Sequence, residues 1–216
     1  MPKTVSFLVD GFNMYHSLNE LQGVSKASVK WLDLMALCKA YLPSVRSNIG
    51  EPVDLAKVHY FSARPDFLSA HKPNTLVRYD TYITALRHSG VVVHLAQFKI
   101  KDTTCPQCKH GFQRHEEKET DVAMAMKLIE VIVRQECDTV VLVTGDTDLI
   151  PAIKTVNSLL PRTKLGVAFP LFRHNNSLEE AANYSFKISQ KNIQRAQFPR
   201  EIVLPDGTKL RKPGSW

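Results

Sequence analysis

Short runs of β-branched and aliphatic residues alternate along this chain with longer segments of helical periodicity. The runs are only a few residues long and apolar on both faces, as expected of buried strands. Buried strands separated by helices predict an α/β fold with a mainly parallel central sheet, helices on both faces and right-handed crossovers. The expected strands are residues 5–9, 55–61, 91–95, 139–143 and 165–169, and the expected helices are residues 12–22, 31–41, 74–88, 120–136 and 149–159.

Two segments interrupt this alternation. Residues 97–118 are expected to form a polar, basic inserted loop that contains a cysteine pair, and residues 190–216 form a basic extension after the domain expected over residues 1–189. Within the extension, Asp206-Gly207 separates two short strand-like pieces. Because Asp-Gly suits the positive φ angles of a type I′ turn, we expect a C-terminal tail or hairpin of this kind.

Positive charge is concentrated in the last part of the chain. The 216 residues include 28 Lys and Arg against 21 Asp and Glu, a net charge of +7. From Lys187 onward there are seven basic and two acidic residues, so the remainder is close to neutral. A basic extension favours a polyanionic partner, because cationic side chains displace the counterions of phosphates, but a solvated surface segment has the same composition.

The composition also excludes several classes of protein. An apolar fraction of 44% with 23% charged residues is that of a globular chain. No apolar run approaches the roughly 18 residues of a membrane span, and the N-terminal run that ends at Asp10 is too short for a signal peptide. Four cysteines, with Cys38 and Cys137 isolated, do not suggest a disulfide framework. We therefore expect a cytoplasmic protein without a membrane partner.

Acidic residues follow the expected strands or begin the next helix. The run 5–9 is followed by Asp10-Gly11, and the run 139–143 is followed by Thr144-Gly145-Asp146-Thr147-Asp148. Asp121 lies at the start of the helix expected over 120–136. Ligands of parallel α/β sheets bind beyond the carboxyl ends of the strands. The four aspartates are therefore expected to share one edge of the sheet.

A cluster of this kind suits a hard divalent cation. Neighbouring carboxylates repel one another, and Mg²⁺ or Mn²⁺ offsets that repulsion and prefers oxygen ligands. Such ions activate water and stabilise the leaving oxygen of a phosphodiester. Taken singly, Asp10 suits a turn, Asp121 the first turn of a helix and Asp148 a helix N-cap. The joint pattern, with Asp146 included, favours a metal site.

Three segments carry a resemblance to a known family. VSFLVDGFNMY, EKETDVAMAM and VVLVTGDTDLIPAI resemble the NYN family, the LabA-like branch of the PIN-domain nucleases, over about residues 1–189. The resemblance implies a three-layer α/β/α PIN-like fold and divalent-metal-dependent cleavage of RNA. By position, it implies that Asn13 orients the first acid and that the metal ligands, and with Asn13 the catalytic residues, are Asp10, Asp121, Asp146 and Asp148.

The chain departs from the family pattern at two places. Asn183 stands where the family usually has Asp, and Glu119-Thr120 replaces the usual Gly-Val before Asp121. The first departure affects any role of position 183. The second alters the residues before Asp121 but keeps its carboxylate.

The cysteine pair in the insertion has the spacing of half a zinc site. Cys105-Pro106-Gln107-Cys108 supplies two thiols, and His110 and His115 are the nearby candidates for further ligands. These histidines follow too soon for the usual finger spacing. A structural zinc, a site completed by a second chain in a homodimer, and an exposed loop with two reduced thiols all remain open.

Basic and aromatic residues in the expected loops could hold RNA, because cations bind phosphates and exposed rings stack on unpaired bases. The candidates are Arg64, Lys99, Lys101, Phe112 and Arg114. The leading hypothesis is a metal-dependent ribonuclease, endonucleolytic on single-stranded RNA, in which Thr144 and Thr147 donate hydrogen bonds to the acids. The alternatives are a non-catalytic RNA-binding or regulatory module on a PIN-like scaffold and a nucleotide phosphohydrolase.

Overall fold

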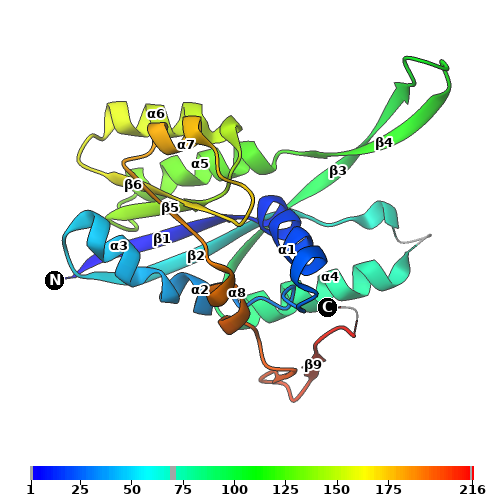
Figure 1. Ribbon diagram of the computed structural model, residues 1–216, viewed down its shortest axis with the longest axis horizontal. Coiled ribbons are helices and arrows are strands. Elements are labelled where there is room, and N and C mark those ends of the chain that lie inside the picture. Colours follow the sequence, from blue (N-terminus) through cyan, green and yellow to red (C-terminus); the bar gives the residue numbers. More distant parts are fainter. Residues whose placement is uncertain (1, 69–71, 215) are drawn as a thin grey trace.

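A seven-stranded sheet lies between two layers of helices in the computed structural model (Figure 1), which describes residues 2–68, 72–214 and 216, without the side chains of residues 114–117. The elements are β1 (Lys3–Asp10), α1 (Gly11–Ser25), α2 (Leu34–Ala40), α3 (Leu42–Ile49), β2 (Val53–Ala63), η1 (Asp66–Leu68), α4 (Pro73–His88), β3 (Val92–Thr104), β4 (Gly111–Lys118), α5 (Thr120–Val133), β5 (Thr139–Val143), η2 (Thr147–Leu149), α6 (Ile150–Leu159), β6 (Lys164–Phe169), α7 (Asn176–Ala181), β7 (Tyr184–Lys187), α8 (Gln190–Arg195), β8 (Glu201–Val203) and β9 (Lys209–Arg211).

The strand order is β4-β3-β2-β1-β5-β6-β7, and every neighbouring pair is parallel except β3 and β4. The expected α/β fold with a mainly parallel sheet is therefore confirmed. The chain adds strands outward from β1 on one side and then outward from β5 on the other. The order of strands thus reverses between β1 and β5, which is where doubly wound sheets form a ligand crevice at the carboxyl ends of their strands.

Each face of the sheet has its own apolar core. Along β1, the side chains of Val5, Phe7 and Val9 pack with α1, α2 and α4, whereas Leu8 packs with α5 and α6 on the other face. This alternation explains why the strand has an unbroken apolar sequence, because both of its faces are covered. Among the described helices, none has the length and apolar character needed to cross a lipid bilayer.

The insertion at residues 97–118 is not a loop. It forms the outer part of β3 and the whole of β4, an antiparallel hairpin that projects from the body as an arm (Figure 1). Residues 105–109 form its turn, where the Lys109 amide donates to the Cys105 carbonyl at 2.9 Å and Lys109 has a φ of 60°. Apolar Phe98 and Ile100 alternate with charged residues along β3, which is the period-two signal of a strand.

The helix expected over residues 31–41 begins later than its sequence suggests. Asp33 caps α2, and its carboxylate accepts a hydrogen bond from the Ala36 amide at 3.0 Å. The residues before it, Trp31 and Leu32, are buried, and Leu32 pairs with Gln197 in an isolated antiparallel bridge. The short elements α3, α7, α8 and β7 were not anticipated.

The extension after residue 189 packs against the domain. The Trp31 indole donates to the Pro199 carbonyl at 2.8 Å, and Trp216 packs on Trp31 and Tyr82. The extension contains the hairpin β8–β9, but the predicted type I′ turn is wrong. Only Gly207 of the Asp-Gly pair has a positive φ, at 83°, and the loop also includes residues 204, 205 and 208. The division after residue 189 stays a prediction.

A buried histidine pair on β2 and β3 predicts a dependence of stability on pH. His59 is 3% exposed, and its Nδ1 lies 3.0 Å from Nε2 of His94. Burial, followed by the charges of His94, Lys127 and Lys57, lowers the pKa of His59 to about 4. Because the unfolded state, with a pKa of about 6.5, then binds more protons, stability is lost as the pH falls from about 6.5 to 4.

We expect this loss to be at most about 3.5 kcal/mol, since the pKa falls from 6.5 to about 4 and one pKa unit corresponds to about 1.4 kcal/mol. Replacing His59 with Gln should flatten the dependence of the unfolding free energy on pH in this window, whereas His88→Gln at an exposed position should not. Urea unfolding at several pH values measures both. Equal slopes for wild type and His59→Gln would contradict the assignment.

Candidate metal centre

Asp10 lies at the carboxyl end of β1 and is 4% exposed. Its Oδ2 accepts hydrogen bonds from the Thr144 hydroxyl at 2.8 Å and from Nδ2 of Asn13 at 2.7 Å. Its Oδ1 accepts from the Asn13 amide at 3.0 Å, which caps α1. Burial raises the pKa of Asp10, these hydrogen bonds lower it, and the nearby charge of Asp146 raises it further, with a net upward shift. The hydrogen bonds therefore fix the position of the Asp10 carboxylate, but they do not fully offset the cost of burying its negative charge.

Asn13 and Thr144 also join Asp10 to the loop after β5. The Gly145 amide donates to Oδ1 of Asn13 at 3.1 Å, and the Asp146 amide donates to the Thr144 hydroxyl at 3.0 Å. Asn13 and Thr144 therefore contact Asp10 in the way their positions suggested. No corresponding hydrogen bond of Thr147 occurs within the described part of the chain.

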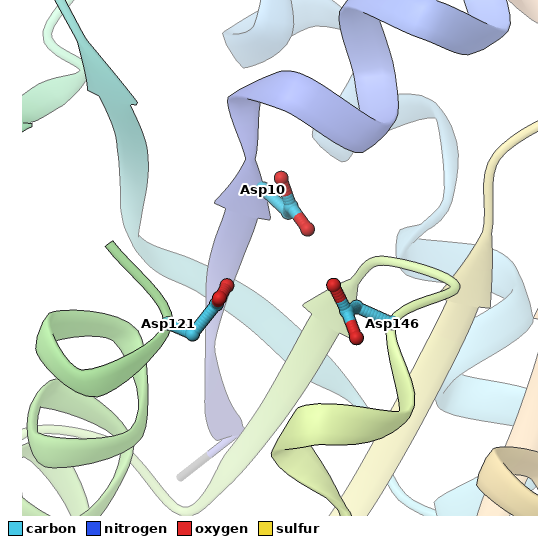
Figure 2. Close-up of side chains that lie close together, drawn as sticks. All are labelled: Asp10, Asp121 and Asp146. Atoms are coloured by element: carbon cyan, nitrogen blue, oxygen red, sulfur yellow. The ribbon is translucent and has the colours of Figure 1, made fainter. Parts of the chain in front are cut away.

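Asp10, Asp121 and Asp146 converge on one space at the edge of the sheet (Figure 2). Asp121 projects from the first turn of α5, and Asp146 lies in the loop after β5. One carboxylate oxygen from each of the three lies within 4.8 Å of the others, and this is the single such group of acids, histidines or cysteines among the described residues. Burial raises the pKa of Asp121, and Asp146, Asp10 and Asp148 raise it further.

This geometry suits a hard cation after a small adjustment. Oxygens on opposite sides of Mg²⁺ are about 4.2 Å apart, because each Mg–O distance is about 2.1 Å. The three acids can approach that spacing by small side-chain rotations or reach an ion through water. Their donor set consists of carboxylate oxygens, and the pKa values of Asp10 and Asp121 are raised, so the group fits Mg²⁺ or Mn²⁺.

Asp148 is not part of this group. It is exposed, and its amide donates to Oδ1 of Asp146 at 3.0 Å. Asp146 is therefore the residue that caps the turn of η2, a role that the sequence suggested for Asp148. Asp148 still lies close enough to raise the pKa of Asp121.

Two glycines near the three acids allow neighbouring backbone segments to pass very close to each other. A Cβ on Gly145 would lie 2.0 Å from the carbonyl oxygen of Arg173, and one on Gly11 would lie 2.4 Å from that of Phe61. Both distances are far below a van der Waals contact, and backbone atoms cannot move aside easily. Any side chain at these positions would displace the loops that hold Asp10 and Asp146.

The two departures from the family pattern have different consequences. Glu119 has a φ of 81°, the left-handed region in which glycine is favoured, so this residue holds a strained conformation directly before α5. Asn183 lies near the amino ends of β6 and β7, where its Oδ1 accepts from the Leu165 amide at 2.6 Å. Asn183 is therefore at the opposite edge of the sheet from the three acids.

The predicted zinc ligands lie at the tip of the arm. Cys105 is half-buried and Cys108 is exposed, and the amides of Cys108 and Gln107 lower the pKa of the Cys105 thiol. His110 is exposed in the same turn, and the side chain of His115 is outside the described residues. No third ligand joins the two thiols among the described side chains, so zinc binding stays a prediction.

The predicted RNA contacts fall into two groups. Arg64 follows β2 and forms a salt bridge with Asp80 at 2.7 Å and another with Asp66, so its charge is already paired. Lys99, Lys101 and Phe112 lie on the arm. The predicted contact Arg114 is also on the arm, but its side chain is outside the described part.

Lys99 pairs with Glu119 at 3.1 Å, and the Phe112 side chain is 44% exposed. Lys99 and Phe112 are exposed on the arm, and the ion pair with Glu119 joins Lys99 to the residue two positions before Asp121.

A cavity beside the acids was not anticipated. It has a volume of about 230 Å³ and lies between α1, α4, the end of β2 and the middle of β3. Its residues come from separate segments of the chain, from Gly11 to Trp216, and no local pattern in the sequence marks them. Only the position of Gly11-Phe12 directly after Asp10 could have drawn attention to this region.

Repulsion among the three acids predicts that removing one charge stabilises the metal-free protein. Asn at position 146 keeps an oxygen that can accept from the Asp148 amide. We expect Asp146→Asn to raise the melting temperature by about 2–4 °C without divalent ions, because two charges about 4 Å apart interact by 1 kcal/mol or more. Asp148→Asn should have a smaller effect. Thermal unfolding in EDTA measures both, and a fall of several degrees for Asp146→Asn would indicate a structural carboxylate instead.

Comparison with known proteins agrees with this fold. The solved structure of a protein of unknown function from Vibrio parahaemolyticus superimposes with a TM-score of 0.53 at 16% identity, covering 88% of this chain and 94% of that one. At this identity the similarity concerns the fold alone. The sequence is 28% identical to 6-hydroxy-3-succinoylpyridine 3-monooxygenase HspA of Pseudomonas putida, over all of this chain and 76% of that protein. The model of the NYN domain matches residues 4–189, and the chain therefore belongs to the NYN domain family.

Proposed function

We propose that this protein is a divalent-metal-dependent ribonuclease of the LabA-like branch, which cleaves single-stranded RNA endonucleolytically. The observation that supports this most is the convergence of Asp10, Asp121 and Asp146 at the point where the strand order of the sheet reverses. NYN proteins belong to the PIN-like nucleases, which generally use divalent metals. The three acids come from separate parts of the chain, so their grouping is a property of the fold.

In this proposal Asp10, Asp121 and Asp146 hold Mg²⁺ or Mn²⁺. A bound ion of this type supplies an activated water and stabilises the leaving oxygen of a phosphodiester. Asn13 and Thr144 keep the Asp10 carboxylate in one orientation through the hydrogen bonds to its oxygens. Asp148, which is exposed and close enough to act on Asp121, would add negative charge beside the ion. Protein groups therefore need only position the ion and the RNA.

The arm is the proposed second contact with RNA. Lys99, Lys101 and Arg114 are proposed to bind phosphates, and Phe112 to stack on an unpaired base. Arg64 contributes by exchanging its carboxylate partners for a phosphate. The compact cation of Lys99 has one exposed ion pair, with Glu119, and such pairs contribute only about 0–1 kcal/mol. A phosphate can therefore compete for Lys99 at low cost.

The cleavage prediction uses a matched pair of substitutions. Asp146→Asn should reduce metal-dependent cleavage of a labelled single-stranded RNA by at least about 100-fold, because an ion ligand is lost. Asp54→Asn, an exposed acid near the other end of the sheet, should cleave at the wild-type rate. Reactions with Mg²⁺, Mn²⁺ or EDTA, on single- and double-stranded RNA and DNA, show which metal the cleavage needs and which class of nucleic acid is cleaved.

The same assay distinguishes the alternatives. Binding of RNA without cleavage in either metal would indicate a non-catalytic module. Release of phosphate from a mononucleotide, without cutting of the oligonucleotide, would indicate a phosphohydrolase. Cleavage by Asp146→Asn at the wild-type rate would contradict the proposed site.

The name of the Pseudomonas putida relative supplies a second candidate, oxygenation of 6-hydroxy-3-succinoylpyridine. An apolar cavity next to the acids is the observation that favours it. We retain RNA hydrolysis as the proposal because the NYN match spans residues 4–189 and the acids form a hard-cation site. Oxygen uptake in the presence of that pyridine and a reductant would support the second candidate.

A structural zinc at the tip of the arm is a separate proposal. Cys105 and Cys108 would supply two thiolates, with His110 and His115 or a second copy of the chain completing the site. We expect protein purified without chelators to contain about one zinc per chain, or about half that in a shared site. Cys105→Ser should lose it and Cys137→Ala, at a buried cysteine outside the arm, should retain it. Elemental analysis together with the molecular mass in solution measures both, and zinc-free wild-type protein would contradict this proposal.

A further inference from the structure

The cavity beside the acids has an aromatic lining. Rings from α1, β2, α4, β3 and the C-terminal extension surround it, those of Phe12, Tyr15, Tyr60, Tyr79, Phe98 and Trp216 among them. Phe12 and Phe98 meet edge to face with their centroids 6.0 Å apart. An apolar cavity of about 150 Å³ holds a benzene molecule, so about 230 Å³ has room for a larger planar ring.

Polar groups occur at a few points of this lining. The Tyr79 hydroxyl is buried and forms no hydrogen bond of acceptable geometry with any described residue. Burial raises the pKa of Tyr79 to about 12, and its polar neighbour Ser62 acts in the opposite direction. Ser62 and Tyr79 therefore place two hydroxyl groups in a lining that is otherwise largely aromatic, and a few polar groups of this kind orient a ligand in an apolar pocket.

Two cations lie on the wall of the cavity, Lys30 from the segment before Trp31 and Arg78 from α4. The Lys30 ammonium donates to Oδ1 of Asn19 at 2.7 Å and lies 5.2 Å from the centroid of the Tyr15 ring. No described carboxylate is within ion-pair distance of Lys30. Burial lowers the pKa of Lys30, and the charge of Arg78 lowers it further.

The cavity and the acids share the same edge of the sheet. Asp10 ends β1, and the next two residues, Gly11 and Phe12, line the cavity. Asp10 is paired with Phe61 on β2, and Ser62 and Ala63, which follow Phe61, also line it. The cavity therefore begins directly beside Asp10, at the same edge of the sheet as the acids.

We propose that this cavity binds one unpaired base of an RNA strand, stacked on its aromatic lining, with the phosphate attached to that nucleotide held by Lys30 and Arg78. This inference rests on the proposed ribonuclease function for the identity of the strand. The base site would place a neighbouring phosphodiester over Asp10, Asp121 and Asp146.

Binding can be tested without metal or catalysis. The chain has two tryptophans, Trp31 and Trp216, which contact each other, and Trp216 lines the cavity. In EDTA, nucleoside 5′-monophosphates should change the tryptophan fluorescence of the whole protein in a saturable way. Adenosine should bind at least about tenfold more weakly than AMP, and ribose 5-phosphate should cause no change, because both the stacked ring and the anion contribute.

Matched variants locate the site. Lys30→Met should weaken nucleotide binding at least about tenfold, whereas Lys39→Met, on α2 outside the cavity, should not. Thr75→Phe should fill part of the cavity and weaken binding, whereas Thr81→Phe, on the same helix but outside the lining, should not. Thermal unfolding shows whether each variant is folded.

The outcomes separate this inference from the proposed function. Nucleotide binding by both the wild type and Asp146→Asn, lost in Lys30→Met and Thr75→Phe, would support the base site even if no RNA were cleaved. Cleavage of RNA by a protein whose fluorescence no nucleotide changes would overturn it and leave the nuclease assignment in place. A response to nicotinate but to no nucleotide would overturn it too, since the occupant would then be a small aromatic acid.

Discussion

The hydrogen bonds around the buried Asp10 carboxylate connect the parts of the candidate site. They come from Asn13 on α1 and from Thr144 after β5, and the same two side chains accept from the amides of Gly145 and Asp146. A carboxylate this deeply buried is stable only with such partners or with a cation. The position of one acid therefore determines the path of the loop that carries the next.

This arrangement places two different chemical environments on either side of the junction between β1 and α1. On one side are carboxylates with raised pKa values, which suit a hard ion. On the other side are aromatic rings with two cations, which suit a flat anionic group. Both depend on Gly11, because only a residue without a Cβ lets the start of α1 lie against the Phe61 carbonyl. A nucleic acid strand presents phosphates, which suit a site with a hard ion, and flat bases, which suit aromatic rings, in regular alternation along its length.

The sequence predicted the sheet and most of the helices because buried parallel strands have apolar residues on both faces. Asp10 and Asp146 were found by their place after such strands, and Asp121 by its place at a helix start. The arm was missed because its sequence is polar overall and contains a cysteine pair, although Phe98 and Ile100 alternate with polar residues as in a strand. The sequence did not show which of Asp146 and Asp148 caps the turn, because that depends on one hydrogen bond, from the Asp148 amide to the Asp146 carboxylate. The cavity combines residues from distant segments, which only the folded chain brings together.

The backbone of Glu119 has a consequence for how Asp121 is held. A side chain at a φ of 81° costs roughly 1–3 kcal/mol, and the surrounding structure must supply that energy at all times. Glycine would relieve this cost but would also give the junction between β4 and α5 more freedom. The chain thus gives up some thermodynamic stability for a rigid backbone at the start of α5, so Asp121 is held with less conformational freedom than a glycine at position 119 would leave it.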